Sequence, residues 1–292
     1  MRIIDAHVHL YPPELNADPT GWAAAQGEAR WATLCTRRRK DGRAVQGFPS
    51  VGELLREMDR AGVDRAVLLG WYWEKPATCV WQNRFYAGCV RAHPDRLAAF
   101  ATVHPHAGHE AALAEVRRAH GDGLIGLGEL SPHSQGHGID DPAFREVLAL
   151  AAELELPVNL HVTDPDGRNH PGRVDTPLAD FVRLAREFSS VDFILAHWGG
   201  LLPLRDAETK MPANVFYDTA ASPLLYDAGV WHRFLAAVPG DRVLFGSDYP
   251  LNLFPKIEPV PEIARLIAEA KSAMIGEGVM GTNAARLLGL GE

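Results

Sequence analysis

Two histidines end the first apolar run of the chain, in the stretch MRIIDAHVHL. Because strand side chains alternate between two faces, a strand here separates a partly polar set from an apolar set. The first set is Ile3, Asp5, His7 and His9, and the second is Ile4, Ala6, Val8 and Leu10. We expect the first set to face the axis of the fold and the second to pack beneath helices. Two imidazoles held by one rigid strand lose little entropy on binding a metal ion, so the pair predicts a metal site.

Four further ionisable residues stand at or near the ends of later apolar runs. They are Glu129 in GLGEL, His161 in VNLHVTD, His197 in ILAHWGG and Asp248 in LFGSDYP. A catalytic zinc needs about three protein ligands, and these residues can complete the set that His7 and His9 begin. Buried ionisable groups are costly unless they are paired or bind a metal, so packing alone explains them poorly. A polar pocket without metal is the alternative.

Two aspartates near these residues have roles that the sequence leaves open. Asp5 either orients a histidine ring or is a buried carboxylate bonded to backbone or to Arg242. Asp218, which lies in the run NVFYDTAAS, is expected near the same pocket.

Basic and aromatic residues after the strands are the candidates for substrate contact. The loop DPDGRNHPGR offers Arg168, His170 and Arg173, and GWYWE adds Trp71, Tyr72 and Trp73. Trp198 and Tyr249 directly follow His197 and Asp248. We therefore expect a small, anionic and ring-bearing substrate. A surface salt bridge is the alternative for each arginine, and the basic run RRRK at 37–40 is interpreted as a solvated loop.

Eight short apolar runs, separated by mostly helical segments, position these residues. The runs span residues 2–10, 64–73, 96–105, 123–130, 156–164, 191–200, 214–222 and 241–250. This alternation predicts an α/β fold of parallel strands, and eight units in 292 residues predict a (β/α)8 TIM barrel. An open doubly wound sheet is the alternative, although no GxGxxG motif follows the first run. In a barrel, the ends of all eight runs meet at the face where active sites are built.

The whole chain, 1–292, is expected to form one domain with a long loop insertion at 11–50 after the first strand. We expect a short helix within this insertion, and a lid over the site is a hypothesis for it. Residues 251–262, after the last strand, form a second, proline-rich loop at the same face.

Composition restricts the partners. The formal net charge is −8, which argues against a nucleic-acid footprint. No apolar run reaches the ~18 residues needed to cross a membrane, and no signal peptide is evident. The three cysteines form no CxxC pair, which favours a reducing, cytoplasmic location. The expected partner is a small-molecule substrate, and the sequence leaves a homo-oligomer open.

The motifs DAHVHL, NLHVT, LAHWGG and LFGSDYP resemble the amidohydrolase superfamily. They are most similar to the branch that includes aminocarboxymuconate-semialdehyde decarboxylase and related hydrolases. The resemblance implies that His7, His9, His161 and Asp248 hold one divalent metal, most often Zn²⁺. It also implies that His197 is an acid/base residue or a ligand to a second metal.

The resemblance leaves the ion count and the reaction open. In TatD-like members a glutamate placed as Glu129 bridges two metals, whereas one ion is usual in the decarboxylase-related branch and is favoured here. The main functional prediction is a hydrolase that uses a metal-activated water, with Asp248 moving the proton and His197 stabilising the oxyanion. The alternatives are a nonoxidative decarboxylase of an aromatic or muconate-like acid, a TatD-like binuclear hydrolase, and a non-catalytic barrel stabilised by metal.

Overall fold

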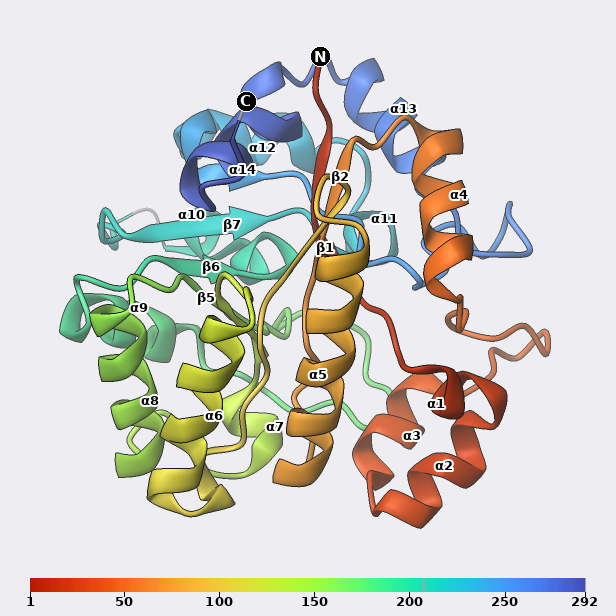
Figure 1. Ribbon diagram of the computed structural model, residues 1–292. Helices are drawn as coiled ribbons and strands as arrows, with labels where there is room; N and C mark the ends of the chain where they lie inside the picture. The colour runs from red at the N-terminus through yellow and green to blue at the C-terminus, as the bar shows by residue number, and fades with distance from the viewer. Residues whose placement is uncertain (207, 292) are drawn as a thin grey trace.

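Eight short strands form the centre of the molecule, and helices surround them (Figure 1). The computed structural model describes residues 1–206 and 208–291. Each predicted apolar run contains one strand. The strands are β1 (Ile4–Val8), β2 (Arg65–Leu68), β3 (Leu97–Ala99), β4 (Leu127–Leu130), β5 (Val158–Leu160), β6 (Phe193–Leu195), β7 (Val215–Asp218) and β8 (Val243–Leu244).

The strands pair in two arcs, β1-β2-β3 and β4-β5-β6-β7-β8, and every ladder within them is parallel. Two single parallel bridges, Ala101 to Leu127 and Val8 to Tyr249, link the arcs at their seams. The backbone N–H of Ala6 also donates to the Phe245 carbonyl oxygen at 2.8 Å across the second seam. This is the TIM-barrel arrangement that the sequence predicts.

Helices fill the connections between the strands and follow the last one. The α-helices are α1 (Pro13–Ala17), α2 (Pro19–Gln26), α3 (Ala29–Cys35), α4 (Val51–Ala61), α5 (Pro76–Ala92), α6 (His109–Gly121), α7 (Pro132–Gln135), α8 (Pro142–Glu153), α9 (Leu178–Glu187), α10 (Leu202–Arg205), α11 (Ser222–Leu225), α12 (Val230–Ala237), α13 (Ala264–Ser272) and α14 (Asn283–Leu287). Short turns of other helix types are η1 (Pro105–Ala107), η2 (His197–Leu201), η3 (Gly240–Arg242) and η4 (Gly278–Thr282). Across the described ranges, no helix is long and apolar enough to cross a membrane.

Helix α4 shows why a connecting segment becomes helical. Ser50 and Glu53 form a reciprocal capping box at its start, and Gly62 ends it in the left-handed conformation at φ 73°. Such a cap stabilises a helix by about 1 kcal/mol. Leu54 and Met58, four residues apart on one face, are fully buried against the barrel.

The two faces of the strands bury two different apolar clusters. The outer cluster packs strand residues such as Leu68 and Leu97 against helix residues such as Leu54 and Tyr86. The inner cluster is built from one face of the strands and from the C-terminal helix. Its members are Ile4, Ala6, Val67, Leu69, Ala98, Phe100, Ile194, Phe216, Leu244, Ala284, Leu288 and Leu290.

Strand β1 departs from the predicted alternation. Ile4 and Ala6 belong to the inner cluster, whereas Val8 packs in the outer one. The prediction that these three side chains share a face was therefore wrong. The pairing of β1 with β2 shifts register between Asp5 and Val8, and such an irregularity changes which face the following side chains occupy.

The insertion at 11–50 contains three helices, α1, α2 and α3, rather than one short helix in a loop. Tyr11 and Trp31 pack with Trp73 in an aromatic cluster that joins the insertion to the barrel. Glu28 is fully buried and accepts the backbone N–H groups of Glu74 and Lys75 at 2.8 and 3.0 Å. In Figure 1 the three helices lie at the opposite end of the molecule from the two termini. The lid function of this segment stays a prediction.

Candidate active site

His7 and His9 lie at the C-terminal end of β1 with their rings in contact. Their Nε2 atoms are 3.2 Å apart, and both side chains are buried. The Nδ1 atoms face outward, 2.9 Å from Asp218 Oδ2 for His7 and 3.0 Å from the Leu69 carbonyl oxygen for His9. Outer partners of this kind fix the ring orientation of metal-ligating histidines. The pair therefore presents two Nε2 atoms to a common point.

Asp218, at the end of β7, is the carboxylate that orients His7. It also accepts hydrogen bonds from Asn159 Nδ2 at 3.0 Å and from the backbone N–H groups of His197 and Ala220 at 3.1 and 3.0 Å. Burial lowers the pKa of His7, but the charge of Asp218 and the hydrogen bond to it outweigh burial and raise this pKa to about 10. The surroundings therefore favour a positive charge at His7, which a proton or a metal ion can supply.

Asp5 binds backbone rather than a histidine ring. Its Oδ1 accepts the N–H groups of His7 at 3.2 Å and Ser247 at 2.9 Å. Burial raises the pKa of Asp5 to about 6. Of the two roles left open by the sequence, the backbone-bonded carboxylate is the one observed. Arg242 instead donates to the Ala213 carbonyl oxygen.

Glu129, in β4, stands between two groups of histidines. Its Oε1 is 2.9 Å from His161 Nδ1 and 3.4 Å from His197 Nε2, while its Oε2 is 3.7 Å from His9 Nε2. Two sets of possible metal ligands therefore share this carboxylate, His7–His9–Glu129 and Glu129–His161–His197, each with its ligand atoms within 4.8 Å. Burial favours the neutral acid, but the nearby histidines hold the pKa of Glu129 well below its usual range.

His161 and His197 follow β5 and β6 and approach each other. His197 Nε2 is 3.3 Å from His161 Nδ1, and His197 Nδ1 lies 3.2 Å from the Ala220 carbonyl oxygen. The sequence grouped His161 with His7, His9 and Asp248. The structure instead places its Nδ1 with Glu129 and His197.

Asp248, after β8, lies beside the two histidines of β1, and its backbone N–H donates to the His7 carbonyl oxygen at 2.8 Å. Its Oδ1 is 3.5 Å from His9 Nε2 and 3.8 Å from His7 Nε2. Its backbone has a φ of 67°, which residues other than glycine rarely adopt. Gly246 makes room beneath, because a Cβ there would lie 2.8 Å from His7 Cβ. Burial raises the pKa of Asp248 to about 7, although the charges of His7 and His197 act to lower it.

Two of the three aromatic residues in GWYWE reach these histidines. Trp71 and Tyr72 are stacked with ring centroids 4.4 Å apart. Trp71 lies 5.4 Å from the His9 ring, and Tyr72 lies 5.1 Å from the His161 ring. Trp73, the third candidate from this segment, is fully buried in the aromatic cluster of the insertion, with its Nε1 donating to Gln82 Oε1 at 2.6 Å. The sequence offered all three residues of this segment and could not separate the two that reach the histidines from the one that does not.

The predicted substrate residues after β5 lie in a loop that is held by its own contacts. Arg173 donates to the carbonyl oxygens of Gly167 at 2.8 Å and Asp164 at 3.0 Å. His170 is half-buried with its Nδ1 3.0 Å from the Pro171 carbonyl oxygen, and Arg168 is exposed.

Trp198 and Tyr249 pack away from the histidines. Trp198 is fully buried against Trp231 and Phe234, with ring centroids 5.0 Å away in each case. Tyr249 is a buried member of the outer cluster, and its backbone carbonyl oxygen accepts the N–H of His9 at 2.7 Å.

Arg37, from the insertion, is a residue that the sequence reasoning assigned to a solvated loop. Its guanidinium is half-buried, and its Nε has no hydrogen-bond partner within the described part of the chain. Burial and the charge of Arg37 both lower the pKa of His170. The basic run marked the position of Arg37, but the partial burial of its guanidinium depends on the folded insertion.

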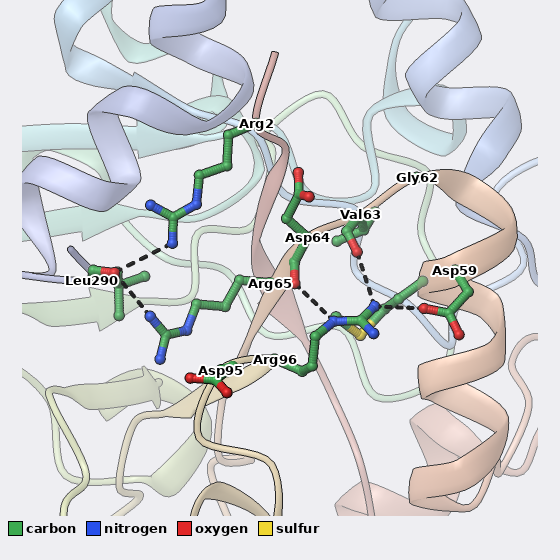
Figure 2. Close-up of a pocket in the computed structure, with 10 residues that line it drawn as sticks. Arg2, Asp59, Gly62, Val63, Asp64, Arg65, Asp95, Arg96 and Leu290 are labelled. Carbon is green, nitrogen blue, oxygen red and sulfur yellow. Dashed lines mark hydrogen bonds and ion pairs between the residues drawn. The ribbon is translucent and has the colours of Figure 1, made fainter. Parts of the chain in front are cut away.

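A separate cavity of about 900 Å³ lies at the other end of the barrel (Figure 2). The three arginines in its lining already bind protein groups. Arg2 and Arg65 donate to the Leu290 carbonyl oxygen at 3.3 and 2.9 Å, and Arg96 pairs with Asp59 at 2.8 Å. Equal numbers of arginines and aspartates line this cavity, and none of the catalytic candidates does.

A family model described as amidohydrolase matches residues 4–290. No curated protein matches the chain by sequence. Solved structures do match. One is a 5-carboxyvanillate decarboxylase from Novosphingobium aromaticivorans, complexed with manganese and 4-hydroxy-3-methoxy-5-nitrobenzoic acid, at 15% identity and a TM-score of 0.74, covering 99% of this chain and 96% of that chain.

Two more solved structures cover both chains almost completely. A 2,6-dihydroxybenzoate decarboxylase from Rhizobium matches at 20% identity and a TM-score of 0.68, over 99% of each chain. A probable 2-pyrone-4,6-dicarboxylic acid hydrolase from Acinetobacter baumannii, with citric acid bound, matches at 15% identity and a TM-score of 0.64, over 99% of this chain and 100% of that chain. At these identities the likeness establishes the shared barrel fold.

Proposed function

Because the chain belongs to the amidohydrolase family, we propose that it is a metal-dependent enzyme that decarboxylates a small aromatic or unsaturated acid without oxidation. The observation that carries this proposal is a ring of four histidines and two carboxylates at the barrel mouth, bordered by the stacked Trp71 and Tyr72. The sequence favoured hydrolysis and kept decarboxylation as the alternative. The decarboxylases among the structural relatives, two of which are described above, now favour that alternative.

The donor set fits a divalent metal ion. Imidazole nitrogens and carboxylate oxygens are the ligands of catalytic zinc, and the Nε2 atoms of His7 and His9 converge while their Nδ1 atoms bind outer partners. The raised pKa of His7 also fits a cation at this place, because it reflects surroundings that attract positive charge. We propose one Zn²⁺ or a similar ion near His7, His9 and Asp248. Glu129 faces the second histidine group and is the residue on which a second ion would depend.

The proposed reaction breaks one carbon–carbon bond and forms one carbon–hydrogen bond. A bound divalent ion supplies Lewis-acid polarisation of substrate oxygens. The bond to the carboxylate breaks, carbon dioxide leaves, and the electron pair left on carbon takes a proton. Asp248 is the proposed proton carrier, because its Oδ1 lies 3.5 Å from His9 Nε2, within reach of a substrate bound beside the histidines. His197 is proposed to hold the position of Glu129 and to exchange protons with solvent.

Substrate shape and charge follow from the rim of the site. The Trp71–Tyr72 stack offers a flat apolar surface to a planar ring. Arg37 offers a guanidinium whose Nε lacks a partner, which suits an anionic substituent. Arg168 and His170 stay proposals for contact with the same anionic substituent. The observed packing gives no support to direct substrate contact by Trp73, Trp198 and Tyr249. A homo-oligomeric state and a cytoplasmic location also stay proposals.

A parallel assay of the purified, metal-loaded protein tests this function. Carbon dioxide release is measured with hydroxybenzoates and unsaturated dicarboxylic acids, and ring opening is measured with lactones. We expect the parent protein to release carbon dioxide. In Asp248→Asn the rate of release is expected to fall by at least about 100-fold, as is usual for removal of a general acid. If the protein opens lactone rings and releases no carbon dioxide, the decarboxylase proposal is wrong and a hydrolase takes its place.

Hydrolysis remains the second candidate. The specific observation in its favour is the hydrolase-named relative, which covers the full length of both chains. In that case Asp248 would accept a proton from the attacking water and His197 would stabilise the oxyanion.

A further inference from the structure

The turn that carries His197 has an unusual backbone. Residues His197 to Leu201 all have φ between 57° and 60°, and two of the five, Gly199 and Gly200, are glycines. The left-handed conformation is unfavourable for His197, Trp198 and Leu201, because their Cβ atoms crowd the backbone. Such a run persists where surrounding contacts hold it, and it is found at functional sites.

Two charged residues hold this turn: Asp218 accepts the backbone N–H of His197, and Arg205, at the end of α10, binds further along. The Nε of Arg205 donates to the Gly200 carbonyl oxygen at 2.7 Å. That carbonyl lies three residues after His197. The guanidinium therefore contacts the backbone of the turn directly.

The other two arms of the same guanidinium bind the loop after β5. Nη2 donates to Asp164 Oδ1 at 2.7 Å, and Nη1 donates to Asp166 Oδ2 at 2.5 Å. Asp164 lies three residues after His161. One planar group with fixed donor directions therefore connects the segments that carry His161 and His197.

The two carboxylate arms differ in exposure. The side chain of Asp164 is 6% exposed, whereas that of Asp166 is 79% exposed. A pair with a water-exposed partner contributes little, because solvent screens it. The Gly200 and Asp164 arms therefore carry the connection, and Asp166 serves as a matched internal control.

We propose that Arg205 is a positioning residue that sets His161 and His197 against Glu129, and that metal binding depends on it through Glu129, the carboxylate that both ligand groups share. The proposal rests on the proposed metal centre. His161 and His197 stand on two segments that Arg205 joins, whereas His7 and His9 stand together at the end of β1.

Cobalt binding to the full-length apoprotein tests the proposal without a substrate. Affinity and the visible d–d spectrum of bound Co²⁺ are measured for the parent chain and for Arg205→Gln, Asp164→Asn and Asp166→Asn. We expect Arg205→Gln and Asp164→Asn to change the spectrum and to weaken binding by at least about tenfold, the range seen when groups behind metal ligands are removed. Asp166→Asn is expected within twofold of the parent. The affinity of Arg205→Lys is expected to lie between those of the parent and Arg205→Gln, because one ammonium cannot bind three divergent acceptors.

The outcomes separate the two proposals. A parent chain that binds no Co²⁺, Zn²⁺ or Mn²⁺ overturns the metal centre. A parent that binds Co²⁺, together with folded Arg205→Gln and Asp164→Asn variants that keep its affinity and spectrum, overturns the role of Arg205. The ¹⁵N resonances of the His197 ring in the metal-free protein give a second reading. They are expected to move in Asp164→Asn and not in Asp166→Asn, and unchanged resonances in both would also overturn the role of Arg205.

Discussion

Replacement of Asp218 by asparagine is the sharpest test of how the first histidine pair is held. Asp218 accepts hydrogen bonds from four donors, on His7, Asn159, His197 and Ala220. The backbone donors of His197 and Ala220 bind Oδ1, and the side-chain donors of His7 and Asn159 bind Oδ2. An asparagine can keep its oxygen at the first position and must then place its amide nitrogen at the second.

The amide nitrogen of Asp218→Asn would face His7 Nδ1 at 2.9 Å and the Asn159 amide at 3.0 Å. A donor there favours the His7 tautomer whose proton is on Nε2, and that proton blocks the atom needed for metal. Loss of the orienting group behind a metal-binding histidine reduces affinity by about 10- to 100-fold, which is about 1.4 to 2.7 kcal/mol. The buried donor–donor contact with Asn159 is expected to lower the free energy of unfolding by a further ~1–3 kcal/mol.

Competition with a fluorescent chelator measures the zinc affinity, and urea unfolding of the metal-free protein measures stability. Two aspartates provide controls. Asp5→Asn is expected to bind zinc within about threefold of the parent, because Asp5 contacts backbone N–H groups rather than a ring. Asp227→Asn is expected to change nothing, because that side chain is 74% exposed. Equal zinc affinity of Asp218→Asn and the parent would refute the claim that Asp218 orients His7.

Three further results are expected. Elemental analysis is expected to find one ion per parent chain. A binding titration is expected to show at least about tenfold weaker metal binding in Glu129→Gln, since both ligand groups share that carboxylate. Two ions in the parent and one in the variant would overturn the single-ion proposal. Zinc affinity is expected to fall by at least about 100-fold from pH 8 to pH 6, because the pKa of His7 is about 10 and binding must displace its proton throughout this range, while Asp248, with a pKa of about 7, adds a second proton below pH 7. A pH-independent affinity would show that His7 is not a ligand. Tyr72→Ala is expected to raise KM for a planar aromatic acid by about 3- to 10-fold through lost stacking. Trp73→Phe is expected to lower Tm and leave KM unchanged, because Trp73 is buried. A raised KM in Trp73→Phe and an unchanged KM in Tyr72→Ala would place the substrate surface at Trp73.

The fold could be predicted well because its signal is local and repeated. Each βα unit repeats an apolar run and a helical segment, and all eight runs contain a strand. The insertion was harder, because α1, α2 and α3 are short and their stability comes from an aromatic cluster between distant residues such as Tyr11 and Trp73.

Face assignments on β1 show a different limit. Strict alternation placed Ile4 and Val8 on one face, but the register shift against β2 separates them. A pairing irregularity is a property of two strands, and a single strand does not encode it alone. The position of Trp73 also depends on distant residues, because it packs with Tyr11 and Trp31 of the insertion while its neighbours at 71 and 72 reach the histidines.

The sequence by itself determined which chemistry is available. Histidines and carboxylates at the ends of apolar runs meet at one face of any parallel barrel, because all strands point the same way. Tertiary structure alone decided how they are grouped. Glu129 shares its two oxygens between two histidine pairs, Asp218 rather than Asp5 orients His7, and Arg205 joins the segments behind His161 and His197. Contacts of a few ångströms between residues far apart in the chain depend on register, turn conformation and packing, and these are set only when the barrel forms.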